Sequence, residues 1–230
     1  MEKEYYRRKA KVIRLYILCE GQTEEMFVNK ILANYFEDTI SLIPIVIATK
    51  RTAYRKYKGG IKSYGKIKKE IEILCKEHKN EFVTTMIDYY GLPEDTPGIS
   101  ISTKDIYETV NNLENVIFND INFDNFIPYI SMHEFEALLF SNCDAFQCRY
   151  SLKIFNELLK VRSAYLTPEH INDSKETAPS KRIINIVKEN SDTYSKITDS
   201  LSILKVLSFE SIRDECKHFN LWIEKIKYLC

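Results

Sequence analysis

Acidic side chains follow two apolar, strand-like runs of the sequence. Residues 12–19 form a run that ends at Glu20 and Gly21, and residues 82–87 form a second run that ends at Asp88. A parallel sheet would bring the carboxyl ends of both strands to one edge, where the ligands and catalytic groups of α/β proteins gather. Taken singly, each acid is better explained as a solvated loop residue or a helix cap. Taken together, the two acids predict the start of a metal site.

Two more acids, Glu134 and Glu136, follow a third apolar run at residues 126–131. On a helix they would lie about 200° apart, so we expect only one of them to face the cluster. A set of carboxylates suits Mg²⁺ or Mn²⁺, which also binds phosphate oxygens. Such a cation activates water and neutralises phosphate charge, while a carboxylate moves protons. The pattern therefore predicts metal-dependent cleavage of phosphodiesters.

A basic segment lies between the first two acids of this set. Residues 50–69 contain nine basic residues and no acidic one, together with three tyrosines and a Gly-Gly pair. Cations can contact phosphates and tyrosines can stack on bases, so the segment predicts a nucleic-acid interface. The alternative is a solvated face. The residues that we expect to contact nucleic acid here are Arg55, Lys56, Tyr57, Lys58 and Lys62.

A second basic site is predicted where Pro179 opens a helix. Lys181 and Arg182 lie in the first turn, where cations oppose the helix dipole. A bound phosphate would remove that conflict, so both residues are further candidates for nucleic-acid contact. Simple solvation of the two side chains is the alternative.

Strand and helix patterns alternate through the first part of the chain, which predicts an α/β fold with a parallel sheet flanked by helices. Strand signals stop after residue 144, and four helical patterns follow. We therefore expect an α/β domain over 1–145 and a helical C-terminal subdomain over 146–230. The predicted strands are 12–19, 42–48, 82–87 and 126–131. The predicted helices are 23–38, 64–79, 103–118, 152–161, 180–188, 197–207 and 209–229.

The composition excludes several classes of protein. The 230 residues are 44% hydrophobic with 12% aromatic residues, which excludes a disordered chain. No apolar run approaches the roughly 20 residues of a membrane span. The basic N-terminus lacks the features of a signal peptide, so we expect a cytoplasmic protein without a membrane partner. Six cysteines without a C-x-x-C pair indicate free thiols.

Several motifs together resemble a known group of proteins. The run from Leu18 to Glu24, followed by a strand that ends in Asp88, resembles the TOPRIM nuclease domain of topoisomerases, primases, OLD-type nucleases and RloB-type defence proteins. A closer likeness is to a bacterial TOPRIM-like family of unknown function. It covers most of the chain and is carried by the segments 20–24, 84–93, 132–140, 177–182 and 218–220.

The resemblance implies roles for individual residues. Glu20 would act in acid–base chemistry or position a metal, and Asp88 would be a metal ligand. The segment 135–139 looks similar to an element of RloB-type proteins, which favours Glu136 as the third acid. TOPRIM proteins usually carry Asp-x-Asp at the second site, whereas Tyr90 stands at the second position here. Either Glu94 or Asp95 takes its place, a single metal binds, or catalysis is lost.

Two hypotheses follow, and they assign the chain to different classes of protein. The first is a Mg²⁺-dependent nuclease that acts on RNA or DNA as the effector toxin of an anti-phage defence system. The resemblance implies an ABC- or SMC-like ATPase as its partner. The second is a catalytically inactive TOPRIM-like module that binds an ATPase or nucleic acid without cutting it. A homo-oligomer is compatible with both hypotheses.

Overall fold

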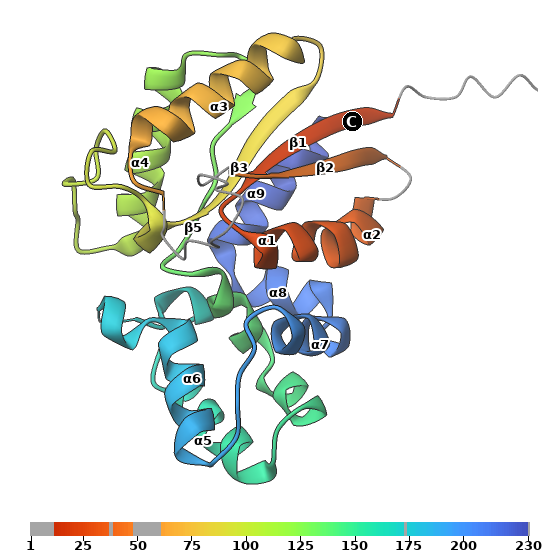
Figure 1. Ribbon diagram of the computed structural model, residues 1–230, viewed down its shortest axis with the longest axis vertical. Coiled ribbons are helices and arrows are strands. Elements are labelled where there is room, and N and C mark those ends of the chain that lie inside the picture. Colours follow the sequence, from red (N-terminus) through yellow and green to blue (C-terminus); the bar gives the residue numbers. More distant parts are fainter. Residues whose placement is uncertain (1–11, 37–38, 48–60, 173, 230) are drawn as a thin grey trace, which may run out of the picture.

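The computed structural model describes residues 12–36, 39–47, 61–172 and 174–229, and the statements below refer to these ranges. The strands of the sheet are parallel and lie in the order β2-β1-β3-β4, with β5 also paired to β3 (Figure 1). Helices flank the sheet, so the predicted α/β class is confirmed. The strands are β1 (Ile13–Cys19), β2 (Ile40–Val46), β3 (Phe82–Asp88), β4 (Phe126–Ile127) and β5 (Ile130–Ser131).

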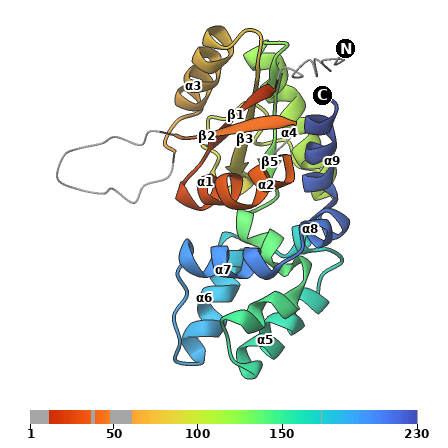
Figure 2. The ribbon, with the colours of Figure 1, turned by 90° about the vertical axis from the view of Figure 1, so that its right-hand side faces the viewer.

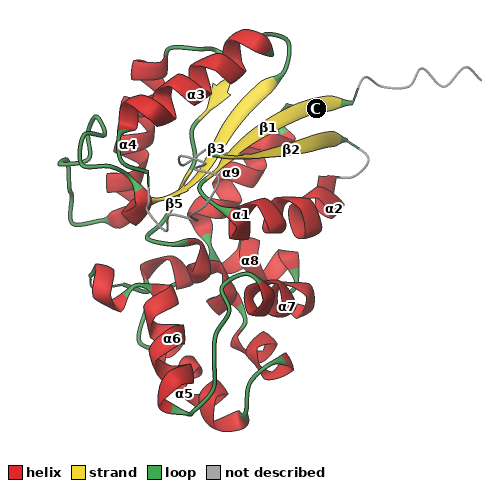
Figure 3. Cartoon of the chain, in the orientation of Figure 1, coloured by secondary structure: helices red, strands yellow, loops and turns green. Residues whose placement is uncertain are grey.

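Helices make up the rest of the regular structure (Figure 3). In the first part of the chain they are α1 (Gln22–Phe27), α2 (Ala33–Phe36), α3 (Tyr64–Glu77) and α4 (Ile106–Ile121), with a π-helical turn η1 (Val28–Leu32) between α1 and α2. The later helices are α5 (Leu152–Ser163), α6 (Pro179–Glu189), α7 (Thr198–Val206), α8 (Phe209–Glu215) and α9 (Lys217–Lys227). Short 3₁₀ helices are η2 (Tyr89–Gly91), η3 (Phe135–Ser141), η4 (Cys143–Cys148), η5 (Pro168–His170) and η6 (Lys175–Thr177).

Both faces of the sheet are buried, as the near-continuous apolar strands predict. Successive side chains of a strand point to opposite faces. In β1, Leu15 and Ile17 join the core cluster that includes α1 and α9, while Tyr16 and Leu18 join the cluster of α3 and α4. Figure 1 shows these helix pairs on either side of the sheet. The sheet is therefore rigid on both sides, and its strand ends are fixed in position.

The fourth predicted strand is interrupted. Its residues form the two short strands β4 and β5, with Pro128 and Tyr129 between them. Proline has no N–H to donate to a sheet ladder. The Thr85 hydroxyl replaces the missing backbone pairing, since its Oγ1 lies 2.7 Å from the Tyr129 carbonyl oxygen and 3.0 Å from the Tyr129 nitrogen. The chain thus stays beside β3 as far as Ser131.

The helix predicted over 103–118 is observed three residues later, as α4. Two other predicted helices differ in their continuity. The first, predicted over 23–38, contains the π-helical turn η1 and begins after Gly21 rather than at Thr23. The last, predicted over 209–229, is divided at Cys216 into α8 and α9. The division has a cause: the Glu169 carboxylate accepts hydrogen bonds from the backbone N–H groups of His218 and Phe219, at 3.0 Å each. This carboxylate caps a new helix.

The final helix returns to the sheet, as Figure 2 shows. Trp222 of α9 is buried, and its Nε1 donates to Thr84 Oγ1 of β3 at 3.0 Å. One continuous core cluster includes Leu15 of β1, Ile203 of α7 and Trp222. The domain boundary predicted near residue 145 remains a prediction.

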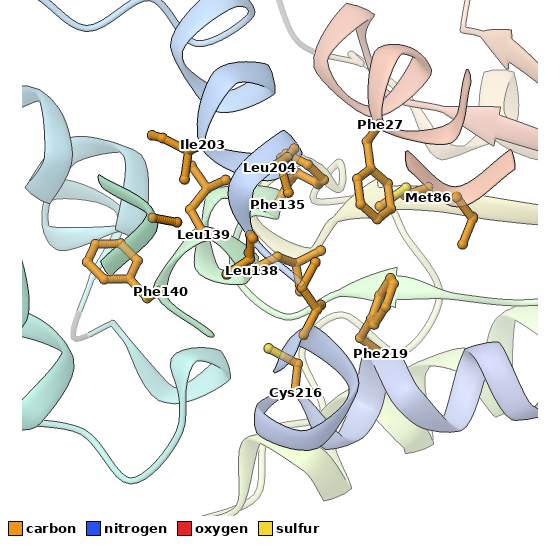
Figure 4. Close-up of a cluster of buried hydrophobic side chains, with 14 of the residues drawn as sticks. Phe27, Met86, Phe135, Leu138, Leu139, Phe140, Ile203, Leu204, Cys216 and Phe219 are labelled. Atoms are coloured by element: carbon orange, nitrogen blue, oxygen red, sulfur yellow. The ribbon is translucent and has the colours of Figure 1, made fainter. Parts of the chain in front are cut away.

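The segment η3 occupies the middle of this core (Figure 4). Phe135 contacts Phe27 edge to face at a ring distance of 5.3 Å, and Leu138 and Leu139 are buried. Burial of the apolar side chains fixes the backbone of η3. The position of Glu136, which lies within η3, is fixed in the same way.

The sequence also carried expectations about membrane-spanning segments and about the cysteines. Within the described ranges, no helix has both the length and the apolar character needed to cross a membrane. The described cysteines are free thiols, of which Cys148 is exposed and the other four are buried. The expected lack of disulfides is confirmed for those five residues.

Candidate active site

Glu20 stands at the carboxyl end of β1, as predicted. Its backbone N–H still pairs with Met86 of β3 at 3.1 Å, which continues the sheet by one residue. Its side chain then turns toward the neighbouring strand, where Oε2 accepts a hydrogen bond from the Asp88 N–H at 3.1 Å. The parallel register of β1 and β3 therefore brings Glu20 and Asp88 together at one edge of the sheet.

Asp88 connects this edge to η3. Its Oδ1 accepts a hydrogen bond from the N–H of Phe135 at 2.9 Å, at the start of the 3₁₀ helix. Glu24 joins the group from the first turn of α1, where its Oε2 accepts from the Gly21 N–H at 2.9 Å. Each carboxylate thus has one oxygen bonded to the backbone, which sets its direction.

Glu134 and Glu136 both act electrostatically on Asp88, whereas we expected only one of them to face the cluster. That expectation assumed a helix through both residues, but Glu134 is extended and η3 begins after it. Glu134 Oε2 accepts from the Ser180 N–H at 2.9 Å, at the N-terminus of α6. Glu136 Oε1 forms an ion pair with Lys196 Nζ at 3.0 Å.

Burial, together with repulsion from the neighbouring carboxylates, raises the pKa values of Asp88 and Glu24. For Asp88, desolvation raises the pKa well above its usual value, and Glu24, Glu20, Glu136 and Glu134 raise it further. Burial is the first cause for Glu24, whose pKa rises to about 7. A site that concentrates negative charge in this way favours a bound cation or a bound proton.

Glu20 and Glu136 follow the same pattern with an opposing influence. Burial raises the pKa of both carboxyl groups, and Lys196 lowers both. Burial lowers the pKa of Lys196 itself, but the attraction of Glu136, Glu134 and Asp88 outweighs it, so the net shift is upward. Lys196 is therefore a charged partner of the cluster, and Coulomb attraction holds it beside Glu136.

The donor set matches Mg²⁺ in chemistry, since the five acids supply oxygen ligands and negative charge. The arrangement is not that of a preformed metal site. Among the described residues, no three His, Cys, Asp or Glu side chains are placed so that they could hold a metal ion. A cation would have to draw the free carboxylate oxygens together by side-chain rotation.

A hollow of about 720 Å³, which we call the acid-side hollow, opens at Glu20. It is lined by Glu20, Lys62, Tyr90, Gly91, Asp95 and Lys175, among others. Lys62 therefore lies at the hollow that contains Glu20, and its contact with nucleic acid stays a prediction. Asp95 also lines it, but its carboxylate accepts from Ser63 Oγ at 2.9 Å and from the Tyr64 N–H at 2.8 Å. These bonds cap α3.

The other predicted nucleic-acid contacts lie in different surroundings. Arg55, Lys56, Tyr57 and Lys58 fall outside the described residues. Arg182 is bonded within the helical part, with its Nε donating to the Thr177 carbonyl at 2.7 Å. Lys181 is exposed in the first turn of α6. The helix N-terminus for which we expected a phosphate instead receives the Glu134 carboxylate.

Gly91 controls the position of Glu20. A Cβ atom at Gly91 would lie 2.6 Å from the Glu20 Cδ, which is closer than nonbonded atoms allow. The atoms in conflict are at the end of a flexible side chain, so the carboxylate would move while the backbone stays.

We therefore expect Gly91→Ala to displace the Glu20 carboxylate with little change in melting temperature. If this edge is catalytic, the same change should lower the rate of the reaction by about 10²-fold or more. Steady-state rates and thermal unfolding of the same preparation test this prediction. Gly65→Ala is the matched control, because a Cβ there meets only ordinary contacts. An unchanged rate in Gly91→Ala would show that the position of Glu20 is unimportant.

Sequence reasoning missed three members of the site. Glu24 was noted only as the last residue of the run 18–24, although its spacing of three from Gly21 is a signal for a bond back to the helix start. Gly91 and Lys196 gave no sequence signal that we recognised. Lys196 lies in the irregular segment before α7 and reaches Glu136 only through the tertiary fold.

Comparison with known proteins gives one match. The profile of the family DUF4276, described as a domain of unknown function, matches residues 19–227. This range includes every acid of the cluster. No curated protein and no solved structure matches the chain.

Proposed function

We propose that this chain, which belongs to the DUF4276 family of domains of unknown function, is a divalent-cation-dependent nuclease. One observation carries the proposal: five carboxylates from β1, α1, β3 and the start of η3 act electrostatically on one another at the carboxyl edge of a parallel sheet. The likeness of segments 18–24 and 84–88 to the TOPRIM nuclease domain supports the same class of reaction.

Mg²⁺ or Mn²⁺ is the proposed cofactor, with Asp88, Glu136 and Glu134 as the residues that would hold it. When bound, the cation would lower the pKa of water and neutralise charge on a phosphate. Glu20 lines the open hollow and has a raised pKa, so it is suited to move a proton there. Lys196 keeps the Glu136 carboxylate in place. Lys62 is suited to contact a phosphate of the substrate.

A second function is favoured by a specific observation. Glu136 is already paired with Lys196, and the acids of the described chain form no preformed metal site. These two facts favour a module that binds nucleic acid or a protein partner without cleaving it. An ABC- or SMC-like ATPase, implied by the resemblance alone, is the proposed partner, and co-expression followed by affinity purification would retain it.

Cleavage assays separate the two functions. The purified chain, alone and with the ATPase, is incubated with single- and double-stranded RNA and DNA in Mg²⁺, in Mn²⁺ and in EDTA. We expect products in Mg²⁺ or Mn²⁺ and none in EDTA. Binding without products in every mixture that includes the ATPase would reject the nuclease and support the non-cleaving module.

A further inference from the structure

A second hollow lies beside the acid site. Its volume is about 510 Å³, within the range of sites that hold small ligands or single nucleotides. Because His133 forms part of its wall, we call it the histidine hollow. Its lining includes Lys104, Tyr107, His133, His170, Asn172 and Lys217.

A compact unit joins the two hollows. The Tyr90 ring lies 5.4 Å from the His133 ring, and the Tyr90 N–H donates to the His133 carbonyl oxygen at 3.3 Å. Tyr90 lines the acid-side hollow, whereas His133 and Asn172 line the histidine hollow. Asn172 Nδ2 donates both to the Tyr90 hydroxyl and to His133 Nδ1, the latter at 3.3 Å. Tyr90, His133 and Asn172 therefore form a wall shared by the two hollows, and one ligand could extend over it from one hollow into the other.

His133 is held in an unusual state. Its φ is +61°, in the left-handed region that non-glycine residues seldom adopt. Since Nδ1 accepts from Asn172, Nε2 carries the ring hydrogen. Among the described residues Nε2 has no hydrogen-bond partner, so it is available as a donor to a ligand.

The rest of the lining has the chemistry of a nucleotide site. Lys104 and Lys217 are exposed cations, and Asp105 beside them has one oxygen bonded to the Tyr107 N–H at 2.8 Å. The rings of Tyr107 and His170 lie 5.1 Å apart and offer a surface for a base. Leu166 adds an apolar side chain that is 83% exposed. Tyr107 and His170 are half-buried, and cations next to partly exposed rings are typical of sites for single strands.

We propose that the histidine hollow binds one nucleotide of a single-stranded nucleic acid whose adjacent phosphate lies over Tyr90 at the acid site. Lys104 and Lys217 would contact its phosphate, His170 would stack on its base, and His133 Nε2 would donate to it. The choice of a nucleic acid as ligand rests on the proposed function. The site itself rests on the geometry above.

Binding in EDTA tests this without requiring cleavage. Short single-stranded RNA and DNA oligonucleotides are titrated with the full chain between about 50 and 200 mM salt and followed by fluorescence anisotropy. We expect the pair Lys104→Ala and Lys217→Ala to weaken binding and to flatten the log–log salt slope by about 1.4. The matched control is Lys153→Ala with Lys160→Ala, two exposed lysines of α5 outside both hollows.

Stacking is tested separately. His170→Ala should weaken binding about 5- to 150-fold, and His170→Phe should restore most of it, because a phenyl ring still stacks. The RNA and DNA arms identify which polymer the site prefers. Wild-type affinity and salt slope in the lysine pair, or no binding of either polymer by the wild-type chain, would overturn the inference.

The outcomes also separate the inference from the proposed function. In Glu20→Gln and Asp88→Asn, binding should still depend on Lys104, Lys217 and His170, since these variants leave the histidine hollow unchanged. Binding that depends on Lys104 and Lys217, without cleavage under any condition, would reject the nuclease and keep the nucleotide site. Cleavage that is insensitive to Lys104, Lys217 and His170 would reject the nucleotide site and keep the nuclease.

Discussion

Asp88→Asn and Glu20→Gln are each expected to lower cation-dependent cleavage by about 10²–10⁴-fold, the usual contribution of a group that handles protons or charge in the reaction. Both replacements keep the local structure. Asparagine retains an oxygen that can accept from the Phe135 N–H, and glutamine retains one for the Asp88 N–H. The change therefore removes charge from the cluster with little loss of packing.

For the same two variants we also predict the melting temperature. Because the wild-type carboxylates repel one another, we expect both variants to melt at the same temperature as the wild type or above it at pH 7.5 without added cation. Asp95→Asn is the control, since Asp95 lines the same hollow but caps α3. A loss of activity in Asp95→Asn as large as in Asp88→Asn would make Asp95 a ligand, as the sequence suggested. Unfolding of Asp88→Asn would instead make Asp88 structural.

The sheet and the meeting of two acids follow from the sequence for a simple physical reason. Parallel strands place their carboxyl ends at one edge, so Glu20 and Asp88 had to lie close once the strands 12–19 and 82–87 were recognised. Their hydrogen bond through the Asp88 N–H is the direct result of this register. Periodicity and strand polarity determine such features locally.

The features that were not predicted depend on contacts between distant segments. Glu134 and Glu136 both reach the cluster because η3 begins at Phe135, and that start is set by the Asp88 carboxylate 47 residues earlier. The division between α8 and α9 depends in the same way on Glu169. No pattern in the neighbouring sequence indicates a helix cap that another element of the fold supplies.

The histidine hollow is a further feature that depends on contacts between distant segments. The sequence alone assigned no role to His133, Lys104 or Lys217. The loop before α4, the segment around His170 and the start of α9 bring these residues to one wall. Such convergence is a property of the tertiary fold, and neither spacing nor composition reveals it.

The stability of the protein is expected to fall as the pH rises from about 4.5 to 7 and to be restored there by Mg²⁺. The Glu24 carboxyl has an ordinary pKa of 4.5 and a pKa of about 7 in the folded protein. Between these values the folded state keeps a proton that the unfolded chain releases. The free energy of unfolding therefore decreases with pH, by on the order of 3 kcal/mol for Glu24.

Cation binding should reverse this loss, because a cation held by Asp88, Glu134 and Glu136 would favour the ionised form of the neighbouring Glu24 carboxyl. At a concentration about 100 times its dissociation constant, a cation that binds only the folded state adds about 2.7 kcal/mol of stability. We expect Mg²⁺ to raise the melting temperature at pH 7.5 and to have little effect at pH 5, where the folded cluster keeps its protons. NaCl at equal ionic strength serves as the control for screening.

Glu24→Gln isolates the origin of the pH dependence. Glutamine does not titrate, yet it keeps an oxygen that can accept from the Gly21 N–H, so the start of α1 is preserved. The variant should lose most of the decline in stability between pH 4.5 and 7 and show a smaller shift with Mg²⁺, because one negative charge of the cluster is gone. If Mg²⁺ stabilises the wild type equally at pH 5 and pH 7.5, or if NaCl reproduces the whole effect, the acids of this edge do not bind the cation. The module that binds without cleavage would then be the better account of their clustering.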